Sequence, residues 1–329
     1  MKQSTVRKMV SIGLVLIFAL LFACTTDYFF TWRNVSSLLR EVSVIGLMSI
    51  GCTFVIIGGG IDLSTGAVMG LSAMIASRLV TDTMLPITLI VVICLAVGVV
   101  AGFVNGILVT IFGLSEFIAT FATSFVFRGF VYMAAYRESG RIITKQVKDA
   151  AFLGLGGNVA GLYYMSIVWF AVVLLTWFLL KQTKVGTYIY AMGSDRKSAE
   201  YTGINVDKIK ILTLVISGFC SALAGVFLLA WQGSAGLNTG VGMEFQAIAA
   251  AVVGGIALIG GRGDTVGTAI GSFFMVMVVN GLYKYGLPTE MQTIFYGIVI
   301  IVMAVFDAVY IKAVSRRHIV SKKADGGAA

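Results

Sequence analysis

Long apolar segments separated by short polar ones dominate this chain. Most of the apolar segments are continuous over about twenty residues, which suits α-helices that cross a bilayer, whereas strands of a membrane barrel alternate over about ten residues. The pattern therefore predicts an all-α, polytopic membrane protein with about ten transmembrane helices. They are expected at residues 9–26, 42–58, 63–80, 85–113, 117–135, 163–180, 211–231, 245–258, 268–282 and 293–311.

Two shorter segments near the start of the chain have their own patterns. Residues 1–8 are basic and lead into the apolar segment 9–26, which suits a signal peptide or a first transmembrane helix. We favour an uncleaved first helix, because many further spans follow. Residues 27–41 mix aromatic and aliphatic side chains with polar ones, which predicts an amphipathic helix lying at the membrane interface.

The composition supports a membrane protein and gives it an orientation. Hydrophobic residues make up 58% of the chain and charged ones only 12%, and the 39 glycines suit close contacts between helices. The net charge of +9 comes mostly from loops and tails, so we expect it to set topology rather than to bind nucleic acid. Cytoplasmic termini would place loop 181–210, with Lys210, and the basic tail 312–329 in the cytoplasm. Loop 136–160 would then lie outside.

The longest polar interruption, residues 181–210, contains a predicted short helix. Ser194 or Asp195 can cap its start, and Gly203 stands where a left-handed C-terminal cap is expected. One reading is an ordered helix presented to a partner protein, and the other is a solvated connector with an incidental helical turn. The sequence pattern by itself leaves both open.

Two glycine-rich turns, at residues 57–62 and 259–264, interrupt apolar segments, and each places an aspartate before the next segment begins. Irregular backbone at membrane depth is tolerated where protein or water satisfies its polar groups. We therefore expect glycine-broken or re-entrant elements near a solute path, including Gly59 and Gly60. The two turns are either an internal duplication or two independent turns.

A few polar residues fall within or beside the apolar segments, where each is expensive enough to need a partner or water. Arg128 is expected to face the interior of the bundle. Asp62 is expected either to accept N–H groups at the start of the next helix or to line a solute path, and Glu244 to cap a helix in the same way. Asn105 and Asn280 suit hydrogen bonds between helices.

Enzyme chemistry has little support in the chain. It contains no Walker A sequence, no HExxH, no GxSxG and no histidine within a predicted span, since His318 lies in the basic tail. Cys24, Cys52, Cys94 and Cys220 fall inside apolar segments and suit packing. We therefore expect no catalytic residue, no metal site and no cofactor in this chain.

Several motifs spaced along nearly the whole chain resemble one known family. The stretch from Gly58 to Ser64, followed by Gly66, is similar to the GGIDLSVG signature of permease subunits in ribose-type ABC sugar importers. Further matches occur in the same order along the chain. They lie at residues 127–129, 190–193, 198–204, 217–218, 222–225, 242–249, 253–255, 260–263, 267–268 and 280–282.

The resemblance implies a single transmembrane permease domain over residues 1–329 in the bacterial inner membrane. It implies import of a pentose, hexose or related small sugar by alternating access. The expected partners are a cytoplasmic ABC ATPase that binds ATP and Mg, a periplasmic sugar-binding protein, and a second permease subunit, either the same chain or a paralogue. The alternative is a secondary, ion-coupled transporter that uses Asp62 or Asp307 as its proton-coupled group.

The resemblance also assigns roles to particular residues. In these importers a short cytoplasmic helix with an alanine, and a glycine a few residues on, docks into a groove of the ATPase. Residues 256–259 and Asp264 depart from the family pattern, which leaves the identity of the sugar open. The implied coupling residues are Ser198, Ala199, Glu200, Gly203 and Ile204, and the implied path or helix-break residues are Gly59, Gly60, Asp62, Ser64, Arg128, Glu244 and Asn280.

Overall fold

The computed structural model describes residues 3–26, 28–135, 146–288, 291–302 and 305, and most of them are helical. Two strands of two residues each, β1 (Asn158–Val159) and β2 (Leu162–Tyr163), form an antiparallel pair. The helices are α1 (Gln3–Thr25), α2 (Trp32–Ile57), α3 (Thr65–Asp82), α4 (Ile87–Thr110), α5 (Glu116–Ala135), α6 (Ala150–Gly154), α7 (Tyr164–Gln182), α8 (Lys184–Ser194), α9 (Arg196–Tyr201), α10 (Val206–Gln232), α11 (Met243–Val253) and α12 (Thr265–Lys284), followed by an apolar helix at Met291–Val302.

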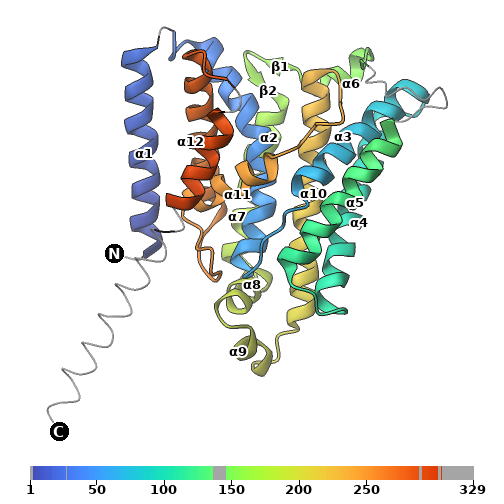
Figure 1. Ribbon diagram of the computed structural model, residues 1–329, viewed down its shortest axis with the longest axis vertical. Helices are drawn as coiled ribbons and strands as arrows, with labels where there is room; N and C mark the ends of the chain where they lie inside the picture. Colours follow the sequence, from blue (N-terminus) through green and yellow to red (C-terminus); the bar gives the residue numbers. More distant parts are fainter. Residues whose placement is uncertain (1–2, 27, 136–145, 289–290, 303–304, 306–329) are drawn as a thin grey trace, which may run out of the picture.

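The long helices form a bundle with two different ends (Figure 1). The short helices α8 and α9 lie at one end, here called the loop-helix end, and α6 with β1 and β2 lies at the other, here called the hairpin end. Helix α1 packs against α12 at one edge of the bundle, and α4 and α5 lie at the opposite edge. Helix α10 is central, because it packs against α2, α3 and α4.

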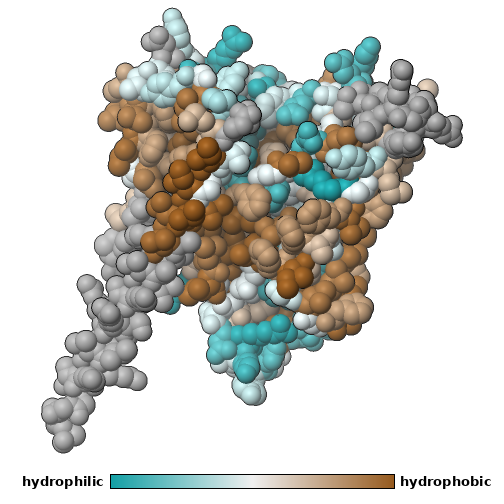
Figure 2. All heavy atoms as spheres, in the orientation of Figure 1, coloured by the Kyte–Doolittle hydropathy of each residue, from teal (hydrophilic) through white to brown (hydrophobic). Residues whose placement is uncertain are grey.

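The surface suits a bilayer. Figure 2 shows a broad hydrophobic band around the middle of the visible face, with hydrophilic residues gathered at both ends. Within the described part of the chain, six helices are long and apolar enough to cross a membrane: α2, α4, α5, α7, α10 and α12.

The predicted count of about ten spans is not confirmed. The segment predicted at 245–258 forms only the 11-residue helix α11, which ends at Gly254. At a rise of about 1.5 Å per residue this helix is roughly 16 Å long, about half of the hydrocarbon thickness. The predicted span 293–311 is described only to Val302 and at residue 305. Asp307 and the whole tail 312–329 lie outside the described residues.

The predicted interfacial helix at 27–41 is wrong. Residues from Trp32 onward are the first turns of α2, which continues without a break to Ile57. The Thr31 hydroxyl accepts a hydrogen bond from the Asn34 N–H at 3.4 Å and caps the start. Because no glycine or proline interrupts residues 32–45, and Leu38 is buried in the core, nothing ends the helix at the expected boundary.

Close helix contacts depend on glycine at the centre of the bundle, as the glycine content predicted. A Cβ atom built on Gly98 of α4 would lie 2.3 Å from the carbonyl oxygen of Gly218 on α10, and one on Gly218 would lie 2.1 Å from the carbonyl oxygen of Gly98. Two backbones can approach this closely only without side chains. This contact holds α4 close to α10.

Candidate functional site

Helix α9 is held at both ends by the caps predicted from the sequence. The Asp195 carboxylate accepts hydrogen bonds from the N–H groups of Lys197 at 3.0 Å and Ser198 at 3.3 Å, and from the Ser198 hydroxyl at 2.8 Å. These bonds, those from Ser198 foremost, lower the pKa of the Asp195 carboxyl below its usual value. Gly203 follows the helix with φ of +83°, the left-handed conformation expected for a C-terminal glycine.

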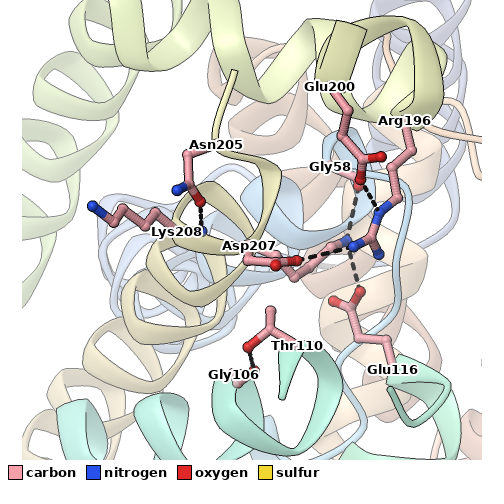
Figure 3. Close-up of polar contacts among 10 residues, drawn as sticks. Gly58, Gly106, Thr110, Glu116, Arg196, Glu200, Asn205, Asp207 and Lys208 are labelled. Carbon is pink, nitrogen blue, oxygen red and sulfur yellow. Dashed lines mark hydrogen bonds and ion pairs between the residues drawn. The ribbon is translucent and has the colours of Figure 1, made fainter. Parts of the chain in front are cut away.

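Charged side chains connect α9 to the start of α10. Figure 3 shows Arg196 between Glu200 and Asp207, with the Arg196 Nε 3.0 Å from a Glu200 oxygen and its terminal nitrogen 2.9 Å from an Asp207 oxygen. All three side chains are about half exposed, so each pair contributes little stability by itself. The pairs link α9 to the first turn of α10.

The five predicted coupling residues do not share one exposed surface. Ser198, Glu200 and Gly203 are exposed, and Ile204 is half-buried. Ala199 is only 4% exposed and packs into the hydrophobic core, so it anchors α9 instead of being presented outward. Tyr201, which the sequence reading did not select, is 90% exposed and is the aromatic side chain that α9 offers to solvent.

The two glycine turns, far apart in the sequence, meet beside the C-terminal end of α8. The Gly261 N–H donates a hydrogen bond of 2.8 Å to the Ile57 carbonyl. A Cβ atom on Gly193 would lie 1.8 Å from that same carbonyl oxygen, and one on Gly260 would lie 2.8 Å from the Gly59 Cα. We call this three-way contact the glycine junction. It links the C-terminal end of α8 to both turns.

The break between α2 and α3 contains a buried carboxylate. Asp62 is 1% exposed, and its two oxygens accept hydrogen bonds from the Ser64 N–H at 2.8 Å, the Ser64 hydroxyl at 2.7 Å and the Ser217 hydroxyl at 2.7 Å. Asp62 thus accepts an N–H group near the helix start, as predicted. The helix begins at Thr65 and not at residue 63, because residues 60–64 continue as irregular backbone.

Neighbouring helices complete a polar cluster at this break. The Asn105 side chain on α4 donates to the Ser64 hydroxyl at 2.8 Å and accepts from the Thr123 hydroxyl on α5 at 2.6 Å. The Leu63 N–H donates to the Thr120 hydroxyl at 3.1 Å. Asn105 therefore makes the interhelical hydrogen bonds predicted for it, and the exposed backbone of the break is satisfied by α5.

A buried ion pair, missed by the sequence reading, closes the same break at the loop-helix end. The Lys210 Nζ lies 2.7 Å from a Glu116 oxygen and donates to the Gly58 carbonyl at 2.9 Å. The side chains of Lys210 and Glu116 are only 6% and 8% exposed, so Lys210, at the end of loop 181–210, is buried in the bundle. Figure 3 shows Glu116 directed toward Gly58. The sequence contains one sign of this pair, because Glu116 and Lys210 each stand directly before an apolar segment. Each charge by itself is explained by a helix boundary, so the sequence does not indicate that the two are paired.

Arg128 and Glu244 line one groove. The groove has a volume of about 380 Å³ and lies between α5 and residues 237–245. Arg128 is half-buried and donates a hydrogen bond to the Thr239 carbonyl. Glu244 lies in the first turn of α11, whose N-cap is Gly242, and its Oε2 is buried with no hydrogen-bond partner in the described part of the chain. A Cβ atom built on Gly66 would lie 2.1 Å from this oxygen, so the oxygen is packed against α3.

The remaining residues lie elsewhere. Asn280 is on α12, and its Oδ1 is buried without a hydrogen-bond partner among the described residues. Asp264, which departs from the family pattern, is the N-cap of α12 and accepts the Gly267 N–H at 2.8 Å. The structure therefore brings Asp62 and Ser64 together at the break and Arg128 and Glu244 together at the groove.

Comparison with known proteins gives a consistent family. Residues 34–304 match the family model described as the branched-chain amino acid transport system permease component. The chain is 38% identical to the ribose import permease protein of Haemophilus influenzae, over 90% of this chain and 91% of that protein. It is 32% identical to the D-allose transport system permease protein of Escherichia coli, over 89% of each. No solved structure matches the chain.

Proposed function

The chain belongs to this permease family, and we propose that it is the membrane-spanning subunit of an ABC importer for a pentose, hexose or related small sugar. The observation that carries the proposal is the match over residues 34–304 together with relatives named for ribose, D-allose and fructose import. The fructose import permease protein of Rhizobium meliloti is 31% identical over 85% of this chain. Two subunits, identical or paralogous, would form the complete path.

The loop-helix end is the side proposed to face the cytoplasm. It carries Lys181, Lys184, Lys197 and Lys208, as the excess of positive charge on cytoplasmic loops requires. The N-terminal end of α1 lies at this end of the bundle as well (Figure 1). A separate ATPase, which binds ATP and Mg, would dock on the exposed side of α9, and a periplasmic sugar-binding protein would dock at the hairpin end.

The contacts described above support a route for the coupling. Closure of the ATPase pair would displace α8 and α9, and the glycine junction would pass that displacement to both helix breaks. The break before α3 continues into the buried cluster around Asp62, and the one before α12 ends at the Asp264 cap. Alternating access would then follow from tilting of α3 and α12 about these breaks.

The test is uptake by the reconstituted complex. The permease, its ATPase and its binding protein are placed in liposomes, and a panel of labelled sugars is offered with and without internal ATP. We expect uptake of one or a few sugars that requires ATP and the binding protein and is unaffected by a protonophore. Uptake without ATP, driven by a pH gradient, would contradict the proposal.

Asp62 distinguishes the proposed importer from the ion-coupled alternative. An Asp62→Asn change keeps the size and most of the hydrogen bonds while it removes the charge. In an ABC importer Asp62→Asn should largely retain uptake, whereas Asp62→Leu should fail to fold. Loss of uptake at every pH in a well-folded Asp62→Asn protein would favour the secondary transporter.

A further inference from the structure

A second cavity, separated from the Arg128 groove by a shared wall, lies within one subunit and opens to its surface. Its volume is about 640 Å³, within the range of small-molecule sites, and its walls come from α2, α10, α11, α12 and the helix Met291–Val302. Residues 237, 238 and 241 line both this cavity and the Arg128 groove. The segment between α10 and α11 is therefore the wall shared by the two spaces.

The polar lining of this cavity has the chemistry of a polyol site. Four carboxamides line it, two on exposed residues and two on half-buried ones, and none of their side chains forms a hydrogen bond with another residue in the described part of the chain. Each carboxamide offers one acceptor and two N–H donors, which matches a hydroxyl that must both donate and accept. The carboxamides belong to Gln232, Asn238, Gln246 and Gln292, and the carboxylate of Glu41 lies beside them.

Aromatic and aliphatic side chains supply the rest of the lining. Trp231 and Tyr296 line the cavity, and Leu228 and Met275 form part of its buried apolar wall. The Arg40 guanidinium lies 4.4 Å from the centre of the Trp231 ring, which holds the indole in place. An apolar ligand would displace water from the carboxamides without replacing its hydrogen bonds. Among the described lining residues Glu41 alone is charged, so an anionic ligand would be repelled. A neutral ligand with several hydroxyls and an apolar ring face satisfies both kinds of wall.

We propose that this cavity binds a neutral monosaccharide within one permease subunit, as a holding site beside the shared path. The choice of a sugar as cargo rests on the proposed function, whereas the site itself rests on the cavity and its unpaired carboxamides. Gln246 on α11 and Gln292 on the helix Met291–Val302 contact the cavity from separate elements, so they serve as independent probes.

The experiment measures binding directly. The full-length permease with its ATPase, in lipid nanodiscs and without the binding protein, is titrated with radiolabelled D-ribose, D-allose and D-fructose. We expect saturable binding of the sugar that the liposome system takes up. Gln246→Leu and Gln292→Leu should each weaken it by about three- to tenfold, because each removes hydrogen bonds while preserving bulk. The control is Gln182→Leu on the exposed end of α7, which should bind as the wild type does.

The outcomes separate this site from the proposed function. A complex that hydrolyses ATP but takes up no sugar contradicts the proposed function. A complex that takes up a sugar, while the permease does not bind it or binds it unchanged in well-folded Gln246→Leu and Gln292→Leu proteins, overturns the cavity site alone. Native mass spectrometry tests whether a lipid occupies the cavity instead. A bound lipid that is retained more strongly in Gln246→Leu or Gln292→Leu than in the wild type also overturns the sugar site. Elution on size exclusion verifies folding, and either variant suffices if the other misfolds.

Discussion

Removing the charge of Lys210 should destabilise the protein more than any exposed charge change. The Lys210 ammonium is paired with Glu116 at 2.7 Å and donates to the Gly58 carbonyl at 2.9 Å, and both charged side chains are less than a tenth exposed. Lys210→Met keeps the length of the side chain but leaves the Glu116 carboxylate buried, with its Oε1 already lacking a partner among the described residues. The cost comes from this uncompensated charge.

The structure sets the size of the effect. Removing one partner of a buried pair costs about 3–5 kcal/mol, and the lost hydrogen bond to Gly58 adds about 1 kcal/mol. Glu116→Gln removes the opposite charge, so the double variant with Lys210→Met contains no unpaired charge. Because a buried pair and its neutral replacement are often of similar stability, the double variant should fall only about 1 kcal/mol below the wild type, the amount of the unrecovered hydrogen bond.

The assay is equilibrium unfolding in mixed micelles of increasing SDS fraction, followed by circular dichroism, for the wild type, the two single variants and the double variant. The matched control is Arg196→Met, which breaks the exposed pairs with Glu200 and Asp207 and should change stability by less than about 1 kcal/mol. A Lys210→Met protein as stable as Arg196→Met, or a double variant no better than Lys210→Met, would refute the reasoning.

Three further changes test the coupling route and the groove. Gly203→Val should abolish co-purification with the ATPase and uptake, because φ of +83° costs a β-branched residue about 1–2 kcal/mol; normal uptake would show that α9 does not dock there. Gly193→Ala should destabilise the protein by about 1–3 kcal/mol in the same SDS assay, since its Cβ would lie 1.8 Å from the Ile57 carbonyl oxygen, whereas Gly129→Ala, with open space around it, should be neutral. Arg128→Leu should preserve membrane insertion but lower uptake, and unchanged uptake and assembly would remove Arg128 from the path.

Local features of this protein could be predicted because they depend on neighbouring residues. A run of about twenty apolar residues favours a transmembrane helix wherever it lies in the chain. The caps of α9 follow from Asp195, whose side chain binds N–H groups two and three residues ahead, and from Gly203, which lacks a side chain and so tolerates a positive φ. Both effects are local. Asn105 could likewise be predicted to bond between helices, because a buried carboxamide needs a partner whichever helix supplies it.

Other features depended on segments that meet only in the folded bundle. The limits of α2 and α11 differ from those expected, because burial against neighbouring helices extends one and Gly254 ends the other. Local hydropathy treats both segments alike and does not contain this information.

The sequence by itself thus determined the membrane class, the family and the capped helix α9, because composition, motif order and caps are properties of contiguous residues. The tertiary structure decided that Lys210 pairs with Glu116, that Gly193 meets Ile57 and Gly261, and that unpaired carboxamides from separate helices face one cavity. The physical reason is distance along the chain. A charge or a glycine indicates that a partner is needed, but helix packing selects which remote segment supplies it.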